Sequence, residues 1–524
     1  MNLSRAFLTV SGLTAASRVL GFVRDVLFAA ALGTGWVADA FLVAFKLPNF
    51  FRRLLAEGAF NAVFIPLFAG RLERDGEAVA RRLADEVLAV LALVLAVLVA
   101  AFEVAMPWVI TVLAPGFVDE PRKFDLAVDL TRITFPYILL ISLVALFGGM
   151  LNSTGRFAAY AAAPILLNLS LIGAAILVHV LEDVHAGRAV SWGVTCGGIL
   201  QLVLVLHAVR RAGMMPRLLL PRLTTGVREL LRRFVPAALG AGVVQINLLI
   251  DLWVASFLST GAISWLYYAD RVNQLPLGVV GIAVGSALLP LLSRQIEARD
   301  EAGANESQSR AIELVMVLTL PAAAALMVIA HPVISALFER GAFNAADSEA
   351  SAAALRAFAA GLPAYVLLKV LAPAFFARKD PGTVLKIAAV GLLSNVAVML
   401  TLVWSLGHVG IALATATAAW INAIILLVLL IRRGHFKADR RLKWRLPRMV
   451  AATSVMAAIL AAVHQSRDHW WLAGGDHIAL YLVVLVALGL IVYATIARQF
   501  GAWAITDLRS MMGREAAGTD DDKR

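Results

Sequence analysis

Several Lys and Arg side chains fall inside stretches that are otherwise apolar, and they are the residues whose type and position could do chemistry. They are Arg18, Arg24, Lys46, Arg52, Arg53, Arg132, Arg271, Arg356, Lys369 and Lys386. A charged side chain at the centre of a bilayer costs at least ~2.5–3.5 kcal/mol on insertion scales. Arginine offers a planar fork of donors that matches phosphate or carboxylate oxygens. A cluster of such arginines therefore predicts an anionic ligand, for example a diphosphate.

The depth of each cation within its apolar stretch separates the functional candidates from the others. Arg18 lies near the middle of the first stretch, and Arg52 and Arg53 lie near the middle of the second. Arg24 and Arg271 lie about two helical turns inside theirs. A cation near the end of a stretch can extend its head group to the interface. Those that this explains are Arg132, Arg356 and Lys386.

Helical spacing gathers polar residues on one side of the first stretch. Ser17, Gly21 and Arg24 follow one another at helical intervals and share a stripe. Arg18 and Asp25 share the neighbouring stripe. A polar wedge of this kind suits a water-filled cavity and suits contact with lipid badly.

The second stretch carries a similar group, although Pro48 can break its helical phase. The residues that would share one broad face are Asp39, Lys46, Asn49 and Arg53. Glu57 lies one turn beyond Arg53 and could neutralise it, which would leave Arg52 for a ligand.

A structural interpretation competes with ligand binding at these positions. The acidic residues could form buried pairs, namely Arg24 with Asp39, Arg53 with Glu57, and Arg271 with Asp270 or Asp251. Pure pairing would not need four or five arginines drawn from three stretches. We therefore favour the interpretation that the arginines bind a ligand.

The composition identifies the kind of chain that holds these residues. Of 524 residues, 61% are hydrophobic and 15% are charged, and the mean hydropathy is +0.83. A soluble domain carries about 25% charged residues, so the composition predicts an integral membrane protein. The net charge is nevertheless +11, and the single cysteine excludes an intramolecular disulfide framework.

The apolar runs predict an all-α polytopic membrane protein with 14 transmembrane helices, since a spanning helix needs about 20 residues. The expected spans are 5–32, 36–69, 83–112, 127–152, 158–181, 189–209, 231–258, 263–293, 311–337, 350–377, 383–404, 410–431, 446–464 and 478–499. The prolines of the second and eighth spans predict kinks.

The distribution of basic residues predicts the orientation of the chain in the membrane. Basic loops stay cytoplasmic, and the loops at 70–82, 210–230, 294–310 and 432–445 hold most of the Lys and Arg. The alternate loops hold few cations, and these are Arg122, Lys123, Arg188, Arg340 and Arg467. Both termini are therefore expected in the cytoplasm. The basic blocks also suit anionic headgroups, although topology is the favoured explanation.

The chain repeats itself at a spacing of about 227 residues. Asp25 matches Asp251, and Asn168 matches Asn395. Six spans in each half enter the membrane in the same sense, which predicts parallel lobes with a site between them. The expected divisions are 1–225 for the first lobe, 226–440 for the second, 441–500 for an added pair of helices and 501–524 for a polar, disordered tail.

The motifs that the chain lacks also restrict its function. It has no phosphate-binding G-x-x-x-x-G-K-[ST] loop and no His/Cys metal constellation, so we expect no cofactor and no enzymatic activity. Energy would then come from a coupling cation, Na⁺ or H⁺, or from the membrane potential. Asp251 and Asn395 could hold such a cation, although polar helix packing is the favoured role.

Two segments resemble the MurJ (MviN) family of lipid II flippases. The first runs from Ser17-Arg18-Val19-Leu20-Gly21 through Phe22-Val23-Arg24-Asp25 to Lys46-Leu47-Pro48-Asn49 and Phe50-Phe51-Arg52-Arg53. The second is Tyr267-Tyr268-Ala269-Asp270-Arg271 with Leu288-Leu289-Pro290. The resemblance covers almost the whole chain and weakens after residue 440.

The resemblance implies a multidrug/oligosaccharidyl-lipid/polysaccharide exporter fold, with two six-helix lobes around a central cavity and two C-terminal helices beside a lipid groove. It implies that lipid II, an undecaprenyl-diphosphate-linked disaccharide-pentapeptide, crosses the bacterial inner membrane during peptidoglycan synthesis. Membrane lipids are expected partners, and the resemblance leaves the cell-wall synthesis machinery open as another. The resemblance implies that Arg18, Arg24, Arg52 and Arg271 line the cavity and are needed for transport, and that Asp39 is also important. The other expected substrate-site residues are Arg53, Asn49, Ser17 and Asp25.

A drug or cation antiporter of the same superfamily is the alternative function. Such a protein would favour an acidic, aromatic-lined pocket, and the number of arginines argues against it. A glycosyltransferase acting on the same lipid would need acidic residues facing an outer loop, and those loops are short.

Overall fold

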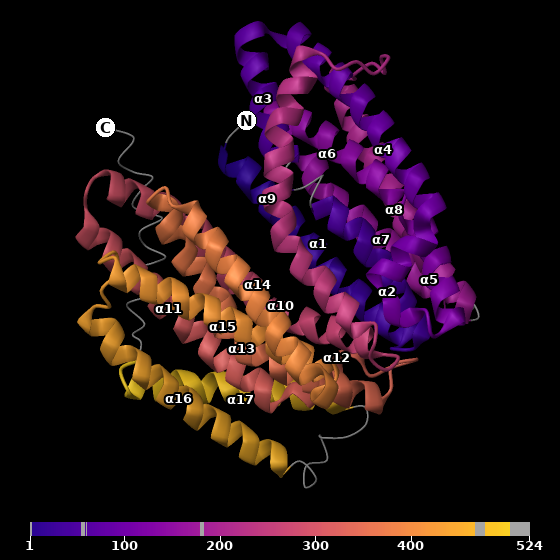
Figure 1. Ribbon diagram of the computed structural model, residues 1–524. Helices are drawn as coiled ribbons and strands as arrows, with labels where there is room; N and C mark the ends of the chain where they lie inside the picture. The colour runs from indigo at the N-terminus through magenta and orange to yellow at the C-terminus, as the bar shows by residue number, and fades with distance from the viewer. Residues whose placement is uncertain (1–2, 54–57, 59, 179–182, 467–476, 503–524) are drawn as a thin grey trace. The chain divides into compact units, whose positions relative to one another are not determined.

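The computed structural model describes residues 3–53, 58, 60–178, 183–466 and 477–502, and every regular element among them is helical. The first half contains α1 (Leu3–Leu32), α2 (Trp36–Phe51), α3 (Phe60–Asp75), α4 (Glu77–Leu113), the 3-10 helix η2 (Pro115–Phe117), α5 (Pro121–Thr134), α6 (Tyr137–Ser153), α7 (Ala158–Val178) and α8 (Asp183–Arg211). The second half contains α9 (Thr225–Ala255), α10 (Ala262–Glu297), α11 (Glu301–Val328), α12 (Ala330–Phe338), α13 (Ala345–Ala377), α14 (Pro381–Leu406) and α15 (His408–Arg432). Two further helices follow, α16 (Arg440–Gln465) and α17 (Ile478–Gln499) (Figure 1).

The all-helical prediction is confirmed at the level of the described residues. Ten helical segments among them are long and apolar enough to cross a membrane. The number of 14 spans, the lobe arrangement and the predicted tail stay predictions, and the tail lies outside the described residues from 503 on.

Local chemistry explains several helix starts. Thr224, Asp300, Asp380 and Asp439 each cap a first turn by accepting a backbone N–H bond.

Three of the predicted spans are interrupted rather than continuous. The span expected at 36–69 comprises α2 and α3, with residues 54–57 and 59 outside the description. The span at 127–152 divides into α5 and α6 at Phe135-Pro136, because proline lacks the N–H that would continue the helix. The span at 311–337 divides into α11 and α12 at Ile329. By contrast, α10 runs through both Pro276 and Pro290.

The described chain forms two compact units. Unit 1 comprises Met1–Ser264 with Phe338–Asp347, and unit 2 comprises Trp265–Leu337 with Ser348–Arg524. The boundary differs from the division predicted at residues 225 and 226, because α9 packs against α3 and α4 inside unit 1. The added pair of helices is not separate either, since α16 packs against α11 inside unit 2.

Reciprocal contacts inside unit 1 relate the two sequence repeats to each other. Ala342 N donates to Ala30 O at 2.8 Å, and Gly116 N donates to Ser256 Oγ at 3.1 Å. Residues 116 and 342 differ by 226 positions, as do residues 30 and 256. The two contacts thus join matching positions with the repeats exchanged, although the acceptor is a backbone oxygen in one and a side-chain hydroxyl in the other.

A second reciprocal pair involves two threonine hydroxyls. Thr34 donates to Asp347, and Thr260 donates to Glu120 Oε2 at 3.4 Å. The threonines are 226 positions apart and the two acids are 227 apart. An exchange of this kind is what a two-fold relation between duplicated segments produces. These contacts therefore support the duplication inferred from the sequence.

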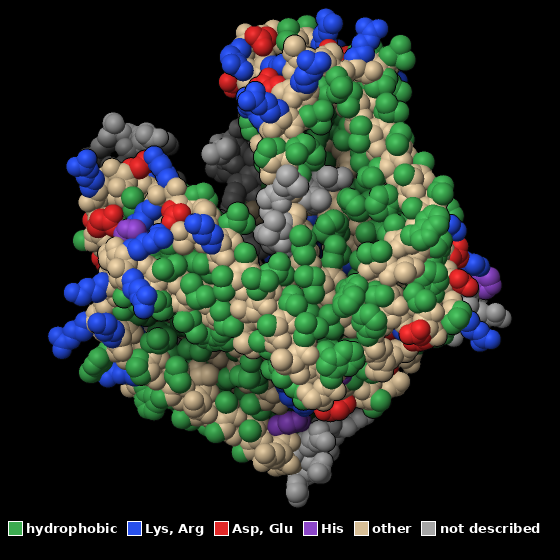
Figure 2. All heavy atoms as spheres, viewed as in Figure 1, with side chains coloured by type: hydrophobic (Ala, Val, Ile, Leu, Met, Phe, Trp, Pro, Cys, Tyr) green, Lys and Arg blue, Asp and Glu red, His purple; other side chains and the backbone are tan. Residues whose placement is uncertain are grey.

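The surfaces of the two units carry the pattern expected of lipid-facing helices. Figure 2 shows hydrophobic side chains spread over the sides of the helices, while Lys and Arg gather towards helix ends. Many large apolar side chains are exposed along α4, α14 and α17, among them Val104, Trp404 and Leu490. Such exposure would be unfavourable in water and suits a hydrocarbon environment.

Candidate substrate-binding site

Arg24 lies buried on α1, where two polar side chains hold its guanidinium. Its Nε and Nη2 donate to Asp25 Oδ1 at 3.0 and 2.7 Å. Its Nη1 donates to Asn168 Oδ1 on α7 at 3.0 Å. Arg24 is 8% exposed and Asp25 is 2% exposed. A buried guanidinium needs such partners, because an uncompensated charge would cost several kcal/mol.

Asn168 connects this ion pair to the preceding part of α1. Its Nδ2 donates to the backbone oxygen of Ser17 at 2.9 Å and lies 3.4 Å from the Ser17 hydroxyl. The amide therefore accepts from one turn of α1 and donates to another. This cross-link ties α1 to α7 at two successive turns of α1.

Arg18 has a different environment from Arg24 although both lie on α1. The side chain of Arg18 is exposed, and no hydrogen bond or ion pair joins it to any residue in the described part of the chain. Its neighbour Ser17 is half-buried. An exposed guanidinium on an apolar helix keeps all five N–H donors for water or a ligand.

Asp39 is a buried carboxylate at the start of α2 that binds the first turn of α10. It accepts from the backbone N–H groups of Gly261 and Ser264 at 2.8 and 3.1 Å, and from the Ser264 hydroxyl at 2.7 Å. Lys123 Nζ lies 3.4 Å from its other side. These are the donors that a helix start leaves unpaired, so Asp39 caps a helix from 222 positions away.

The sequence did not predict a role for Lys123, which belongs to this network. It was assigned to an outer loop, but it is 2% exposed and lies 3.6 Å from Glu120 and 3.2 Å from Thr260 Oγ1. Its ammonium also lies over the Phe117 ring at 4.4 Å. The sequence offers one indication of this role. Lys123 lies in a loop expected on the side of the membrane with few cations, where topology does not explain its charge.

The pairing of the buried charges differs from the structural alternative considered above. That alternative paired Arg24 with Asp39, whereas the structure shows Arg24 bonded to Asp25 and Asp39 bonded to Lys123. Asp25 and Arg24 lie on adjacent helical stripes, but the long guanidinium arm reaches sideways to its neighbour. Part of the buried charge in unit 1 is therefore neutralised locally.

The end of α2 carries the remaining candidates of unit 1. Asn49 Nδ2 donates to Phe45 O at 2.9 Å, and Arg52 Nε donates to Asn49 Oδ1 at 3.1 Å. Arg52 is half-buried and Arg53 is exposed. Asn49 thus orients Arg52, whereas the predicted polar face placed Asn49 with Arg53, and that shared face stays a prediction. The pairing of Arg53 with Glu57 lies outside the described residues.

Arg271, the candidate from the second half, lies on the part of α10 that belongs to unit 2. Its guanidinium lies over the Tyr267 ring at 4.7 Å, a favourable cation–π contact. Asp270 accepts a hydrogen bond from Gln274 on the same helix. Because Arg271 and the other three arginines belong to different units, their convergence on one ligand stays a prediction.

The coupling-cation candidates are likewise divided between the units. Asp251 is half-buried on α9 in unit 1, and Asn395 is 1% exposed on α14 in unit 2. Among the residues that the structure describes, no cluster of three or more His, Cys, Asp or Glu side chains could hold a metal ion. The cation site stays a prediction.

Two solved transporters share the fold of this chain. A solved lipid II flippase MurJ in an inward closed conformation superposes with a TM-score of 0.79 at 24% identity, covering 94% of this chain and 98% of that one. An inward-facing MATE multidrug transporter of the MOP superfamily follows with a TM-score of 0.66 at 15% identity, covering 79% and 94%.

Sequence comparison identifies the family to which the chain belongs. The family model "Lipid II flippase MurJ" matches residues 28–483. A probable lipid II flippase MurJ of Rhizobium meliloti is 44% identical, covering 99% of this chain and 98% of the relative. The lipid II flippase MurJ of Burkholderia cenocepacia is 37% identical, covering 88% and 90%. The chain therefore belongs to the MurJ lipid II flippase family, which confirms the resemblance, and it is a multi-pass inner-membrane protein.

Proposed function

We propose that this chain moves lipid II from the inner to the outer leaflet of the bacterial plasma membrane. The observation that carries the proposal is the family match, which extends along almost the whole chain. The ten apolar helices supply a membrane-spanning body. A flippase transfers its substrate without making or breaking covalent bonds, so we also propose that the chain is not an enzyme.

The diphosphate of the substrate is proposed to bind to Arg18, Arg24, Arg52 and Arg271. The residues proposed to complete the site are Asp39, Arg53, Asn49, Ser17 and Asp25. The exposure of Arg18 supports a direct contact, because its donors face away from the packed interior of unit 1. Arg24 already donates to Asp25 and Asn168, so it would hold the polar wall of the site in place. Charge-assisted hydrogen bonds of this kind are about twice as strong as neutral ones.

Transport is proposed to follow alternating access between the duplicated halves. Lipid II would enter sideways from the inner leaflet, its headgroup in a polar cleft and its prenyl tail in lipid beside α16 and α17. The halves would then tilt and expose the headgroup to the outside. The termini would lie in the cytoplasm, as the basic loops predict.

The driving force is proposed to be a coupling cation, Na⁺ or H⁺, or the membrane potential. Moving one charge through 100 mV is worth about 2.3 kcal/mol. Asp251 and Asn395 are the cation-ligand candidates. Their support is their position in the repeat, since they match Asp25 and Asn168, which meet around Arg24 in the first half. The cell-wall synthesis machinery is a further proposed partner.

A headgroup-accessibility assay tests the central proposal. Purified chain in liposomes should move fluorescent lipid II to the opposite leaflet, and Arg18→Ala with Arg271→Ala should abolish movement. The matched control is Lys386→Ala, which removes an exposed cation from α14 that interfacial snorkelling explains. Movement at the normal rate in the folded double arginine variant would contradict the arginine site.

Depletion in a bacterium separates the flippase from the antiporter. Loss of a flippase should leave lipid II on the inner face of the membrane and end in lysis. Loss of an antiporter should leave the lipid distribution unchanged and increase sensitivity to drugs. The second result would overturn the proposed function.

A further inference from the structure

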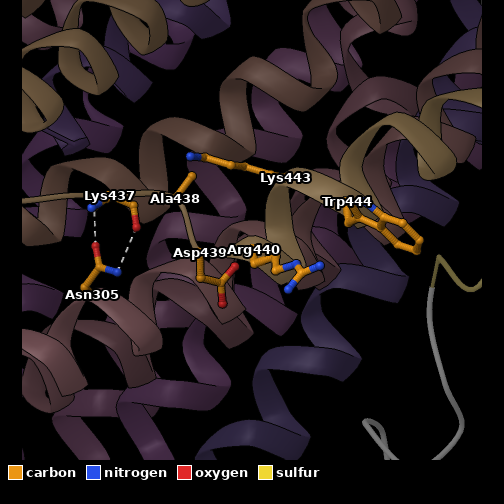
Figure 3. A pocket seen from close by; sticks show the side chains of 7 residues that line it. All are labelled: Asn305, Lys437, Ala438, Asp439, Arg440, Lys443 and Trp444. Atoms are coloured by element: carbon orange, nitrogen blue, oxygen red, sulfur yellow. Dashed lines mark hydrogen bonds between the residues drawn. The ribbon is translucent and has the colours of Figure 1, made fainter.

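A pocket outside the candidate substrate site lies where α16 begins in unit 2. Its volume is about 530 Å³. The residues that line it are Asn305, Lys437, Ala438, Asp439, Arg440, Lys443 and Trp444 (Figure 3). One comes from α11, and the others come from the segment before α16 and from its first turns. Most of the lining residues are polar or basic, but their carbon stems and the Trp444 ring supply much of the surface.

Hydrogen bonds fix the backbone that forms the pocket. Asn305 Nδ2 donates to Lys437 O at 2.8 Å, and Lys437 N donates to Asn305 Oδ1 at 2.7 Å (Figure 3). Asp439 Oδ1 accepts from Leu442 N at 2.6 Å and caps α16. The segment is therefore held at both ends, and its basic side chains extend from a defined backbone.

The cations near the start of α16 fall into two groups. Arg441 and Arg445 turn towards α11 and pair with Glu313, which is 6% exposed. Arg310 pairs with the same carboxylate. The three arginines share one buried carboxylate, and the two from α16 thereby attach that helix to α11.

The pocket cations have no such partner. Within the described part of the chain, no ion pair joins Lys437, Arg440 or Lys443 to any acid, and all three are exposed. The only carboxylate in the lining is Asp439, which is occupied in capping. The lining therefore carries three positive charges against one negative charge, so an anion would be attracted to it.

The position of the pocket along α16 indicates where that anion comes from. The first turns of α16 are basic, and the apolar part of the helix follows Arg448, so the pocket lies just before the part that would enter the hydrocarbon. Trp444 is 62% exposed, and the Arg448 guanidinium lies over its ring at 3.7 Å. Exposed tryptophan and arginine at a helix end are typical of the headgroup region of a bilayer.

We propose that this pocket binds the phosphate headgroup of an anionic phospholipid. Lys437, Arg440 and Lys443 would contact the phosphate oxygens, and Trp444 would pack against the glycerol and upper acyl chains. Basic pockets between membrane helices bind lipid headgroups in this way. Bound lipid would add a contact between α11 and α16 beside the Glu313 pairs, and so would stabilise the attachment of the last two helices. The proposal does not depend on which lipid the chain transports.

The test is lipid retention by the purified full-length chain, measured by native mass spectrometry in detergent. Phosphatidylglycerol should be retained in preference to phosphatidylcholine. The variant Lys437→Gln/Arg440→Gln/Lys443→Gln should lower the phosphatidylglycerol affinity by about fivefold per cation, and by about a hundredfold together. Because these side chains are exposed and make no ion pair with described residues, the lipid-free variant should unfold at the same temperature as wild type.

The matched control is Arg217→Gln/Arg222→Gln/Arg228→Gln, which removes three exposed cations from unit 1. It should retain phosphatidylglycerol as wild type does. Equal loss in both variants would mean that total charge attracts the lipid, and the pocket proposal would be wrong. Equal retention of phosphatidylcholine would also overturn it. If inorganic phosphate alone displaces the lipid and raises the unfolding temperature equally, the site takes soluble phosphate and the lipid assignment fails.

Discussion

Two arginines on neighbouring turns of α1 have opposite environments. Around residue 24 the helix is buried, and Arg24 is bonded to Asp25 and Asn168. Around residue 18 the helix is exposed, and Arg18 extends away from the packed interior. From the sequence alone the two arginines are predicted to have the same role, because each is a charge inside an apolar stretch. The structure separates a charge that holds helices together from one that is available to a ligand.

The comparison teaches that substitutions at the two positions should fail for different reasons. Removing one partner of a buried ion pair leaves an uncompensated charge and is strongly destabilising, whereas removing an exposed charge costs little. Stability and transport must therefore be measured together. The same distinction extends to Asp39, which is buried, and to Asp380, which is only half-buried.

Arg24→Ala should have the largest effect on stability. It leaves the Asp25 carboxylate buried without its guanidinium and removes the donor to Asn168. We expect the free energy of unfolding to fall by about 3–5 kcal/mol, with loss of transport. Denaturant unfolding in detergent measures the free energy of unfolding, and the liposome assay measures transport.

A double variant separates the two contributions of Arg24. Arg24→Ala/Asp25→Ala removes both charges and should recover much of the stability, since replacing a buried pair with apolar groups is often nearly neutral. Transport should remain lost. If Arg24→Ala alone were as stable as wild type, the structural role assigned to this pair would be incorrect.

Asp39→Asn should have the next largest effect. The amide keeps one acceptor but loses the charge that faces Lys123, and its NH₂ group is placed against backbone donors of the first turn of α10. We expect a loss of about 2–3 kcal/mol in the free energy of unfolding.

Adding Lys123→Met to Asp39→Asn removes the stranded ammonium and should return part of that loss. Thermal unfolding of the two single variants and the double variant gives the coupling between the side chains. Strictly additive losses would show that the two groups do not interact.

Arg18→Ala should leave stability within about 0.5 kcal/mol of wild type, because the side chain is exposed and makes no ion pair with the described residues. Transport should fall by about 10- to 100-fold, the loss expected for one hydrogen-bonded contact to a charged group. The liposome assay and a parallel melting curve measure both quantities. A variant that transports normally would remove Arg18 from the site, and one that unfolds early would show that α1 depends on it.

The sequence predicted most of the helices because their signals are local. The apolar runs that correspond to α7, α14, α15 and α17 begin and end within a few residues of the observed bounds. The interruption at Phe135-Pro136 was not predicted, although the proline offered a local reason. Periodicity identifies an apolar stretch but does not show whether one helix or two will fill it.

The sequence predicts which residue types form the candidate site, but it predicts only some of the contacts between them. Arg24 and Asp25 were recognised as polar neighbours, but Asn168 entered only as a marker of the repeat, since its contact spans 144 positions. Lys123 was assigned to a loop, and its contact with Asp39 was not predicted because the two residues are also distant in sequence. Contacts of this length depend on how helices pack, and a single sequence carries no direct record of them.

The smallest effect is expected at Asp380, a half-buried carboxylate between α13 and α14. Hydrogen bonds from Thr383 and from Arg433 lower its pKa from 3.8 to about 2. A lowered folded-state pKa contributes stability above the unfolded value, and that contribution is lost as the pH falls from about 4 towards 2. Asp380→Asn should therefore flatten the pH dependence of the unfolding temperature in this window, with only a small change at neutral pH because the pair is exposed to solvent. Melting curves of wild type and variant, recorded in detergent across that range, measure the difference. Parallel curves would show that the Asp380–Arg433 contact makes no contribution to stability, which would place this charge with Arg18 among those that the fold can lose.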